Sequence, residues 1–233
     1  MLRLRRIALV MLAALALVAA GCTGDDEPKP GGPLPAADGL LDDAAKSAAE
    51  ITSTHFVVRT EGQVPGLTVK GIDGDLSLQE KKVAAKGTAT IELMGNQAEA
   101  KFVLADGTLY LDPGSGTYQK IPEEQAKAVY DFSAVLDPER GVAKLIGELA
   151  DAKTVKQEKV GGIDAYKIDG TATKESIAGL VPRANADVPV SLWVTTDNHQ
   201  PVQAAATFPG EQKGKLTVTL SKINEPVSVE PPA

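Results

Sequence analysis

The stretch from Gly87 to Asp112 constrains the fold of this chain most strongly, because its apolar and polar side chains alternate. Successive side chains of a β-strand point to opposite faces of a sheet, so a period of two indicates strands with one apolar face. The dipeptides Gly95-Asn96 and Asp106-Gly107 interrupt the alternation as turns do, which predicts an antiparallel meander. The apolar positions of this face are Ala89, Ile91, Leu93, Ala98, Ala100, Phe102, Leu104, Leu109 and Leu111.

The first 21 residues have the charge pattern of a secretory signal peptide. Arg3, Arg5 and Arg6 precede the uncharged apolar run Ile7–Ala20, which is shorter than the ~20 residues that a membrane-spanning helix needs. Removal of residues 1–21 deletes three arginines and no acid, so the net charge moves from −7 to −10. An acidic protein repels phosphate backbones, which argues against nucleic acid as a partner.

The leader ends in Ala20-Gly21-Cys22, which resembles a bacterial lipobox. In a lipobox the signal peptide is cut before the cysteine, here after Gly21, and Cys22 becomes the diacylated first residue. Ala19 stands where a lipobox usually has leucine, and the alternative is an ordinary signal peptide that happens to contain a cysteine. Cys22 is the only cysteine, which excludes an intrachain disulfide and a cysteine-based metal site.

The remaining chain alternates between helical and strand-like patterns. The clearest amphipathic helix has apolar residues at i, i+3, i+4 and i+7, and these are Val142, Leu145, Ile146 and Leu149. A stripe suited to lying on a sheet consists of Leu41, Ala44, Ala45 and Ala48. The predicted elements are a helix capped by Asp38 and reaching about Ile51, strands over 54–62 and from Leu76, helices from Pro122 to about Phe132 and from Asp137 through Leu149, a hairpin at Gly161-Gly162 followed by a strand over 165–170, a helix over 173–181, and strands over 188–195, 201–208 and 215–223.

These elements predict an α+β fold in which helices cover one face of a long antiparallel sheet. A sheet of this length curls, and its inward positions are often small, as at Ala89, Ala204 and Ala206. Small side chains leave space beneath helices that stand off a concave face, which favours an apolar cavity. An ordinary packed core built from alanine and valine is the alternative, and the alternation alone does not decide between them.

Catalytic patterns are weak throughout the chain. Gly114-Ser115-Gly116 lacks the spacing of a nucleophile elbow and follows Asp112-Pro113, as a turn would. His55 and His199 are the only imidazoles and are read as surface or packing residues. Asp73 and Asp75 lack the spacing and closing glutamate of an EF-hand, so no metal site is expected. The sequence therefore predicts a protein that is not an enzyme and has no cofactor.

Several segments together resemble the mycobacterial LppX/LprA/LprF/LprG lipoprotein family, most closely its LprG-like members. The similarity extends from Cys22 almost to the end of the chain. The segments are Gly31-Gly32-Pro33-Leu34-Pro35, Val64-Pro65-Gly66-Leu67, Phe102-Val103, Asp106-Gly107-Thr108-Leu109-Tyr110, Val135-Leu136-Asp137-Pro138, Ala150-Asp151-Ala152-Lys153 and Trp193-Val194.

The resemblance implies a curved antiparallel half-barrel with helices over its concave face, enclosing a hydrophobic pocket for acyl chains. LprG-like members are associated with triacylated glycolipids, namely phosphatidylinositol mannosides, lipomannan and lipoarabinomannan, and with triacylglycerol. They are also linked to a major-facilitator transporter. Only Cys22 carries over from the family as a functional position. Strand and helix periodicity gives the expected pocket lining, which is Ala89, Ile91, Leu93, Ala98, Ala100, Phe102, Leu104, Val142, Leu145, Ile146, Leu149, Leu216, Val218 and Leu220.

The expected organisation is a lipoprotein signal peptide at 1–21, a lipidated N-terminus and flexible tether at 22–38, a lipid-binding half-barrel at 39–225 and a C-terminal tail at 226–233. The expected function is a carrier anchored on the extracytoplasmic face of the cell membrane, which moves acylated glycolipid or triacylglycerol toward the outer envelope. One alternative is an adaptor or scaffold lipoprotein with a packed core that docks on a transporter or a cell-wall component. A chaperone for other lipoproteins is a third reading.

Overall fold

A computed structural model describes residues 32–79, 82–93, 96–127, 134–137, 139–181, 183–210 and 213–232. By its internal contacts the chain divides into Met1–Gly32 and Pro33–Ala233, and every element described below belongs to the second unit. The predicted lipidation residue Cys22 and the predicted cleavage position Gly21 lie outside the described residues.

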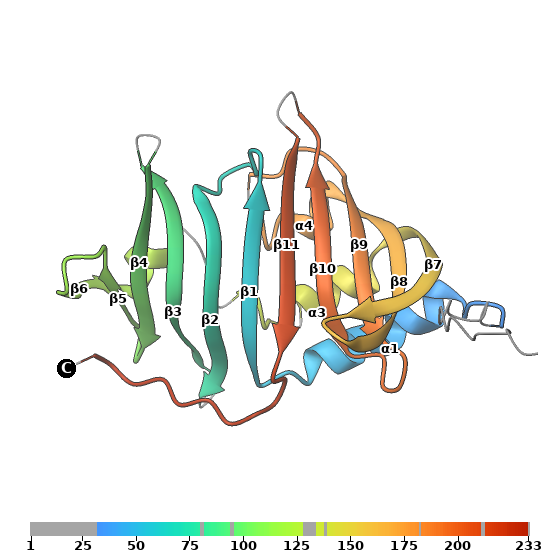
Figure 1. The fold of residues 1–233 in the computed structure, drawn as a ribbon, viewed down its shortest axis with the longest axis horizontal. Helices are drawn as coiled ribbons and strands as arrows, with labels where there is room; N and C mark the ends of the chain where they lie inside the picture. The colour runs from blue at the N-terminus through green and yellow to red at the C-terminus, as the bar shows by residue number, and fades with distance from the viewer. Residues whose placement is uncertain are drawn as a thin grey trace, which may run out of the picture. The chain divides into compact units, whose positions relative to one another are not determined.

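The unit Pro33–Ala233 is built on one curved antiparallel sheet of eleven strands (Figure 1). The strand order is β6-β5-β4-β3-β2-β1-β11-β10-β9-β8-β7, so the described strands leave the sheet open, with β6 and β7 at its edges. The curved, unclosed antiparallel sheet confirms the predicted fold class. The strands are β1 (Ser53–Glu61), β2 (Val69–Gln79), β3 (Lys82–Leu93), β4 (Asn96–Ala105), β5 (Thr108–Asp112), β6 (Gln119–Pro122), β7 (Ala150–Val160), β8 (Ile163–Ala172), β9 (Val188–Thr195), β10 (Pro201–Phe208) and β11 (Gly214–Ser221).

The register of the meander confirms the alternation that the sequence predicts. Ala89 pairs with Ala100 and Ile91 with Ala98, so the apolar residues of β3 and β4 share one face. Asp106 and Gly107 have φ angles of 50° and 70° and form the tight turn between β4 and β5. The positive φ at both residues explains why this turn contains aspartate followed by glycine.

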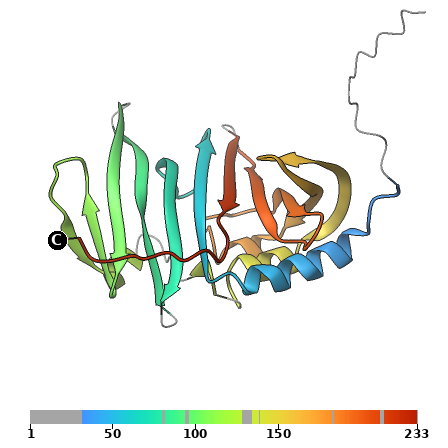
Figure 2. The ribbon, with the colours of Figure 1, turned by 60° about the horizontal axis from the view of Figure 1, so that its bottom comes forward.

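Helix α1 (Ala37–Ala49) crosses beneath the strands of the β7–β10 side on the concave face (Figure 2). Its predicted stripe is confirmed, because Leu41, Ala44 and Ala48 are buried in the core there. The predicted cap at Asp38 is wrong: Ala36 occupies the N-cap position without a side-chain hydrogen bond. Asp38 instead lies in the first turn, where its carboxylate complements the positive end of the helix dipole.

The other helices are α2 (Glu123–Lys127), α3 (Val142–Gly147) and α4 (Lys174–Ile177). The prediction that Pro122 begins a helix is wrong, because it ends edge strand β6, where a missing N–H costs no ladder hydrogen bond. Residues 128–133 of that predicted helix lie outside the described residues. In α4 the expected start is confirmed, with the Thr173 side chain accepting a hydrogen bond from the Ser176 N–H.

The predicted start of the amphipathic helix at Asp137 is also wrong, because α3 begins only at Val142. Asp137 closes a turn in front of the helix, where its Oδ1 accepts from the Glu139 N–H at 2.8 Å and its carbonyl accepts from the Gly141 N–H at 2.7 Å. Leu149 lies beyond the helix yet is buried in the same core as Ile146. The apolar spacing therefore predicted which residues are buried but overestimated the length of the helix.

Two apolar cores lie on the concave side of the sheet. The first core joins helices α1, α3 and α4 to strands β8, β9 and β10, and includes Leu40, Ile146, Ile168, Leu192 and Phe208. The second core lies on the β2–β5 side and consists of buried Leu76, Ala85, Phe102 and Leu104 with partly buried neighbours, including Phe56 and Ile72. The helices thus pack over one part of the concave face, and a separate cluster covers another.

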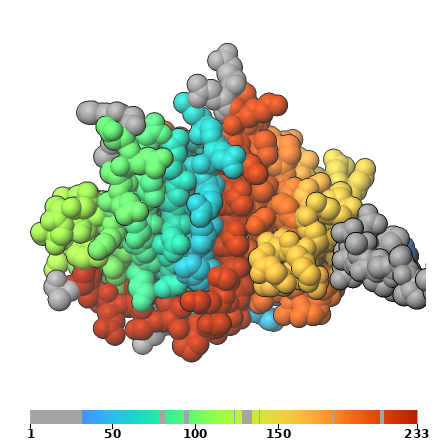
Figure 3. Space-filling view, viewed as in Figure 1, coloured from blue at the N-terminus to red at the C-terminus, as the bar shows by residue number. Residues whose placement is uncertain are grey.

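The C-terminal segment after β11 packs against the outer, convex face of the sheet and does not simply end the fold. Val229 is buried against Ala84 and Ala105, and the Lys86 ammonium donates to the Ser228 carbonyl at 2.8 Å. Figure 3 shows this segment running along one end of the strands on the outer face. The tail therefore covers apolar side chains that would otherwise face water.

Candidate functional site

Several apolar side chains of the concave face belong to neither core, among them Leu78, Ala100 and Ile121. Five of them are half-buried and form what we term the central strip, which consists of Val58, Ile91, Ala98, Val218 and Leu220. Val58 and Val218 are paired across β1 and β11, between the strands of the two cores. Ile91 and Ala98 are paired across β3 and β4 near the hairpin end of these strands. No apolar cluster of the described residues includes the strip.

Two glycines flanked by two phenylalanines form a row across strands β1 to β4, beside the strip. Phe56 pairs with Gly74, Gly74 with Gly87, and Gly87 with Phe102, so two glycines lie between two aromatic rings. A Cβ atom at Gly74 would lie 2.5 Å from the Lys86 carbonyl oxygen, and one at Gly87 would collide with the Asp73 carbonyl. Only glycine permits this close approach of β2 and β3, which bends the sheet around its concave side.

A cavity of about 760 Å³ lies at the end of the sheet where β1 passes into β2, and we term it the β1–β2 cavity. The loop between β1 and β2 lines this cavity. It packs onto the first core, because Val64 is buried in that core and Leu67 packs against it. One wall carries an ion pair in which Lys70 Nζ lies 3.0 Å from Glu92 Oε2. The lining residues are Thr60, Gly62, Gln63, Val64, Pro65, Gly66, Leu67, Thr68, Val69, Lys70, Glu92, Pro209 and Gly210.

The residues that the sequence predicted to line a pocket are distributed over three places. In the first core lie Val142, Leu145, Ile146, Leu149 and Leu216. In the second core or packed against it lie Ala89, Phe102 and Leu104. Ala100 is buried at 3 % exposure, and Leu93 has a side chain outside the described set. The remaining four, Ile91, Ala98, Val218 and Leu220, belong to the central strip, and none of the predicted residues lines the β1–β2 cavity.

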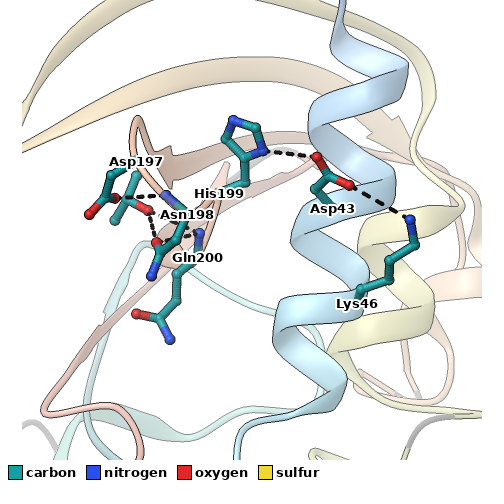
Figure 4. Close-up of polar contacts among 7 residues, drawn as sticks. Asp43, Lys46, Asp197, Asn198, His199 and Gln200 are labelled. Atoms are coloured by element: carbon teal, nitrogen blue, oxygen red, sulfur yellow. Dashed lines mark hydrogen bonds and ion pairs between the residues drawn. The ribbon is translucent and has the colours of Figure 1, made fainter.

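Both histidines contact carboxylates. His55 lies in β1 with Nδ1 2.9 Å from Asp75 Oδ1 and Nε2 3.6 Å from Asp73 Oδ1. His199 lies in the turn between β9 and β10, with Nδ1 3.0 Å from Asp43 Oδ2 on α1, and Asp43 also contacts Lys46 (Figure 4). These contacts join strand to strand and turn to helix, which is a structural role for both histidines.

The Gly114-Ser115-Gly116 segment forms a turn around Asp112. Burial opposes ionisation of the Asp112 carboxyl, but hydrogen bonds from the backbone N–H groups of Gly114, Gly116 and Ser115 outweigh it, so the pKa of Asp112 lies below its ordinary value. The Ser115 hydroxyl lies 3.3 Å from the same carboxylate. The turn reading of this segment is therefore confirmed, and Ser115 faces the group that organises the turn.

A model of the LppX_LprAFG lipoprotein family matches residues 36–229. The chain belongs to the LppX_LprAFG lipoprotein family. Two proteins similar to this chain are both named lipoarabinomannan carrier protein LprG. The protein of Mycolicibacterium smegmatis is 35% identical over 229 residues, which cover 96% of this chain and 94% of that protein. The protein of Mycobacteroides abscessus is 34% identical over 232 residues, which cover 98% and 97%.

Two solved structures of LppX_LprAFG lipoproteins share the fold. LprF from Mycobacterium bovis has a TM-score of 0.75 at 24% identity, covering 87% of this chain and 100% of that chain. LppX from Mycobacterium tuberculosis has a TM-score of 0.65 at 23% identity, covering 83% and 98%. The family resemblance predicted from the sequence is thus confirmed. Within the part of the chain that the structure describes, no helix is long and apolar enough to span a bilayer.

Proposed function

We propose that this protein is a membrane-anchored lipoprotein that binds the acyl chains of envelope lipids on the concave face of its sheet. The observation that carries the proposal is the central strip, because its apolar side chains remain half-buried while both neighbouring cores are packed. Apolar surface that a protein leaves uncovered in a concave position is the usual place for an apolar ligand. The relatives named lipoarabinomannan carrier proteins support a lipid as that ligand.

The binding energy would come from the hydrocarbon chains. Each methylene removed from water contributes roughly 0.8 kcal/mol, so two or three long chains outweigh the few hydrogen bonds that a headgroup can make. Val58, Val218 and Leu220 lie on β1 and β11, in the middle of the strand order. An acyl chain placed on them would therefore lie on the concave face between the two halves of the sheet. The cargo we propose is acylated glycolipid, such as a phosphatidylinositol mannoside or lipoarabinomannan, or triacylglycerol.

The proposed location is the extracytoplasmic face of the cell membrane, where lipidated Cys22 anchors the protein and residues 22–38 act as the tether. From there the protein would carry its cargo toward the outer envelope together with a major-facilitator transporter. No catalytic step is needed for this function, and we propose that the protein is not an enzyme. The family description as lipoproteins and the signal-like leader support the anchor.

A pair of tryptophan variants tests the proposal. Val218→Trp places a large ring on the central strip, whereas Thr217→Trp places the same ring on the outer face of the same strand. Each protein is expressed in M. smegmatis with its leader, purified from membranes, and measured by native mass spectrometry and lipid extraction. We expect acyl lipid bound to the unchanged protein and to Thr217→Trp, and loss of most of it from Val218→Trp.

The adaptor with a packed core is the second candidate, and the two packed cores on the concave face favour it. It predicts that the unchanged protein purifies without lipid and that both tryptophan variants behave alike. Either result would contradict the carrier proposal, provided that circular dichroism shows both variants to be folded.

A further inference from the structure

The chain after β11 leaves the sheet and crosses its outer face. Asn224 fixes the start of this crossing, because its N–H donates to the Ser53 carbonyl and its Oδ1 accepts from the Thr52 N–H, both at 2.8 Å. Residues 226–232 follow, and we term them the strap. The strap runs along one end of the strands, from the β1 side to β3 and β4 (Figure 3). The crossing is thus tied to the sheet at Asn224, and the strap makes a separate contact beyond it.

Two valines hold the strap to the sheet. Val229 is 5% exposed and lies against Ala84 of β3 and Ala105 of β4, and Val227 packs against the same cluster. The residue between the valines is exposed, which indicates an extended chain whose valines both face the sheet. The surface beneath them is therefore an apolar site for an extended chain that has aliphatic side chains two residues apart.

The polar contacts of the strap do not belong to the ladder of the sheet. The strap makes no backbone–backbone hydrogen bond with the described residues, and three of its seven residues are prolines, which have no N–H to donate. The Lys86 ammonium donates to the Ser228 carbonyl at 2.8 Å, and this contact is exposed to water. Release of the strap therefore leaves the strand pairing intact and uncovers the apolar site.

A buried hydroxyl lies between the two places where the crossing chain is held. Ser77 pairs in register with Ser53 of β1 and with Ala84 of β3. The Ser53 hydroxyl donates to the Glu225 carbonyl at 2.6 Å, and Ala84 lies under the strap. Ser77 is 4% exposed, and its hydroxyl has no hydrogen-bond partner among the described residues. Pro226, which follows Glu225, has no N–H to donate, so the strap fills the apolar site but leaves this hydroxyl unpaired.

We propose that the strap covers a docking site for an extended segment of a partner protein, and that this segment displaces the strap. The partner places two aliphatic side chains where Val227 and Val229 lie, and a residue with a backbone N–H where Pro226 lies. That N–H donates to the Ser77 hydroxyl, which the strap leaves unpaired. The docking site is on the face opposite the central strip, so partner binding and lipid binding use separate surfaces.

Peptide binding to the full-length protein tests the proposal. The double variant Val227→Asp/Val229→Asp releases the strap, because two carboxylates cannot be buried against the sheet without partners. Fluorescence anisotropy measures the affinity of three labelled peptides: the strap peptide EPVSVEPP, which copies residues 225–232, an alanine peptide EAVSVEPP, and an aspartate peptide EPDSDEPP. The unchanged protein, whose strap occupies the site, is the control. Circular dichroism checks the fold, and Val229→Ala replaces the double variant if the latter is unfolded.

We expect the strap peptide to bind the released protein roughly tenfold more tightly than the unchanged protein, because the attached strap competes at a high effective concentration. The aspartate peptide should bind neither protein. The affinity ratio of the alanine peptide to the strap peptide should fall about fivefold when Ser77→Ala is added to the released protein, since this comparison isolates the hydrogen bond to the hydroxyl.

Three results would overturn the docking site: no binding of the strap and alanine peptides to the released protein, equal binding to the released and unchanged proteins, or a peptide ratio that Ser77→Ala leaves unchanged. The acyl lipid bound to the released protein is measured in parallel by native mass spectrometry. Its loss or retention bears on the carrier function and not on the docking site.

Discussion

At the scale of single residues, side chains that share one face of the sheet have different neighbours. Ile91 and Leu104 occupy the same face of neighbouring strands, yet Leu104 is buried in a core and Ile91 is half-buried in the strip. The period of two contains no information on the partner across the face, because that partner comes from a distant part of the chain. The residues predicted to line a pocket therefore lie in different surroundings.

The paired glycines provide a prediction at this scale. Gly87→Ala adds a methyl group that must push apart Asp73 and Gly74 of the neighbouring strand, so we expect a loss of about 1–3 kcal/mol in the free energy of unfolding. The control Thr88→Ala changes the outward side of the same strand and should alter stability by less than about 0.5 kcal/mol. Urea denaturation measures both, and equal midpoints would show that the close approach is unimportant.

At the scale of elements, strands were predicted better than helices. Strands β9 and β10 span the predicted residues, since both are rich in apolar and β-branched residues and are bounded by turn residues. Helix α3 is shorter than predicted. Pro122 and Asp137 were predicted to begin helices, but Pro122 ends a strand and Asp137 lies in a turn, and proline and aspartate suit those places equally well. The first arm of the hairpin at Gly161-Gly162, strand β7, received no predicted bounds because an edge strand with many lysines lacks a clear apolar face.

The C-terminal segment gives a prediction for an element. Removal of residues 227–233 would expose Ala84 and Ala105 and delete buried Val229, whose burial alone contributes about 1.5–3 kcal/mol. We expect a lower thermal midpoint and unchanged lipid binding, because the segment lies on the face opposite the strip. Removal of residues 231–233, which leaves Val229 in place, is the control. If both truncated proteins melt at the same temperature, the segment does not stabilise the sheet.

At the scale of the whole molecule, the meander and the helix signals predicted a long, curled antiparallel sheet with helices on its concave side, and the family resemblance added that the sheet is a half-barrel. The β1–β2 cavity could not be predicted, because Gln63, Glu92 and Pro209 meet only after three separate hairpins are folded. No periodic pattern marks such a meeting of loops.

The central claim is that hydrocarbon chains lie on the concave face, and photo-crosslinking measures this most directly. A phospholipid with a diazirine near the end of one acyl chain is loaded onto the full-length protein, irradiated, and the modified residues are identified by mass spectrometry. Our account predicts adducts on the central strip, at Val58, Val218 and Leu220, and none at the outward-facing neighbours Val57 and Thr219. Adducts confined to the outer face, or spread equally over both faces, would contradict it.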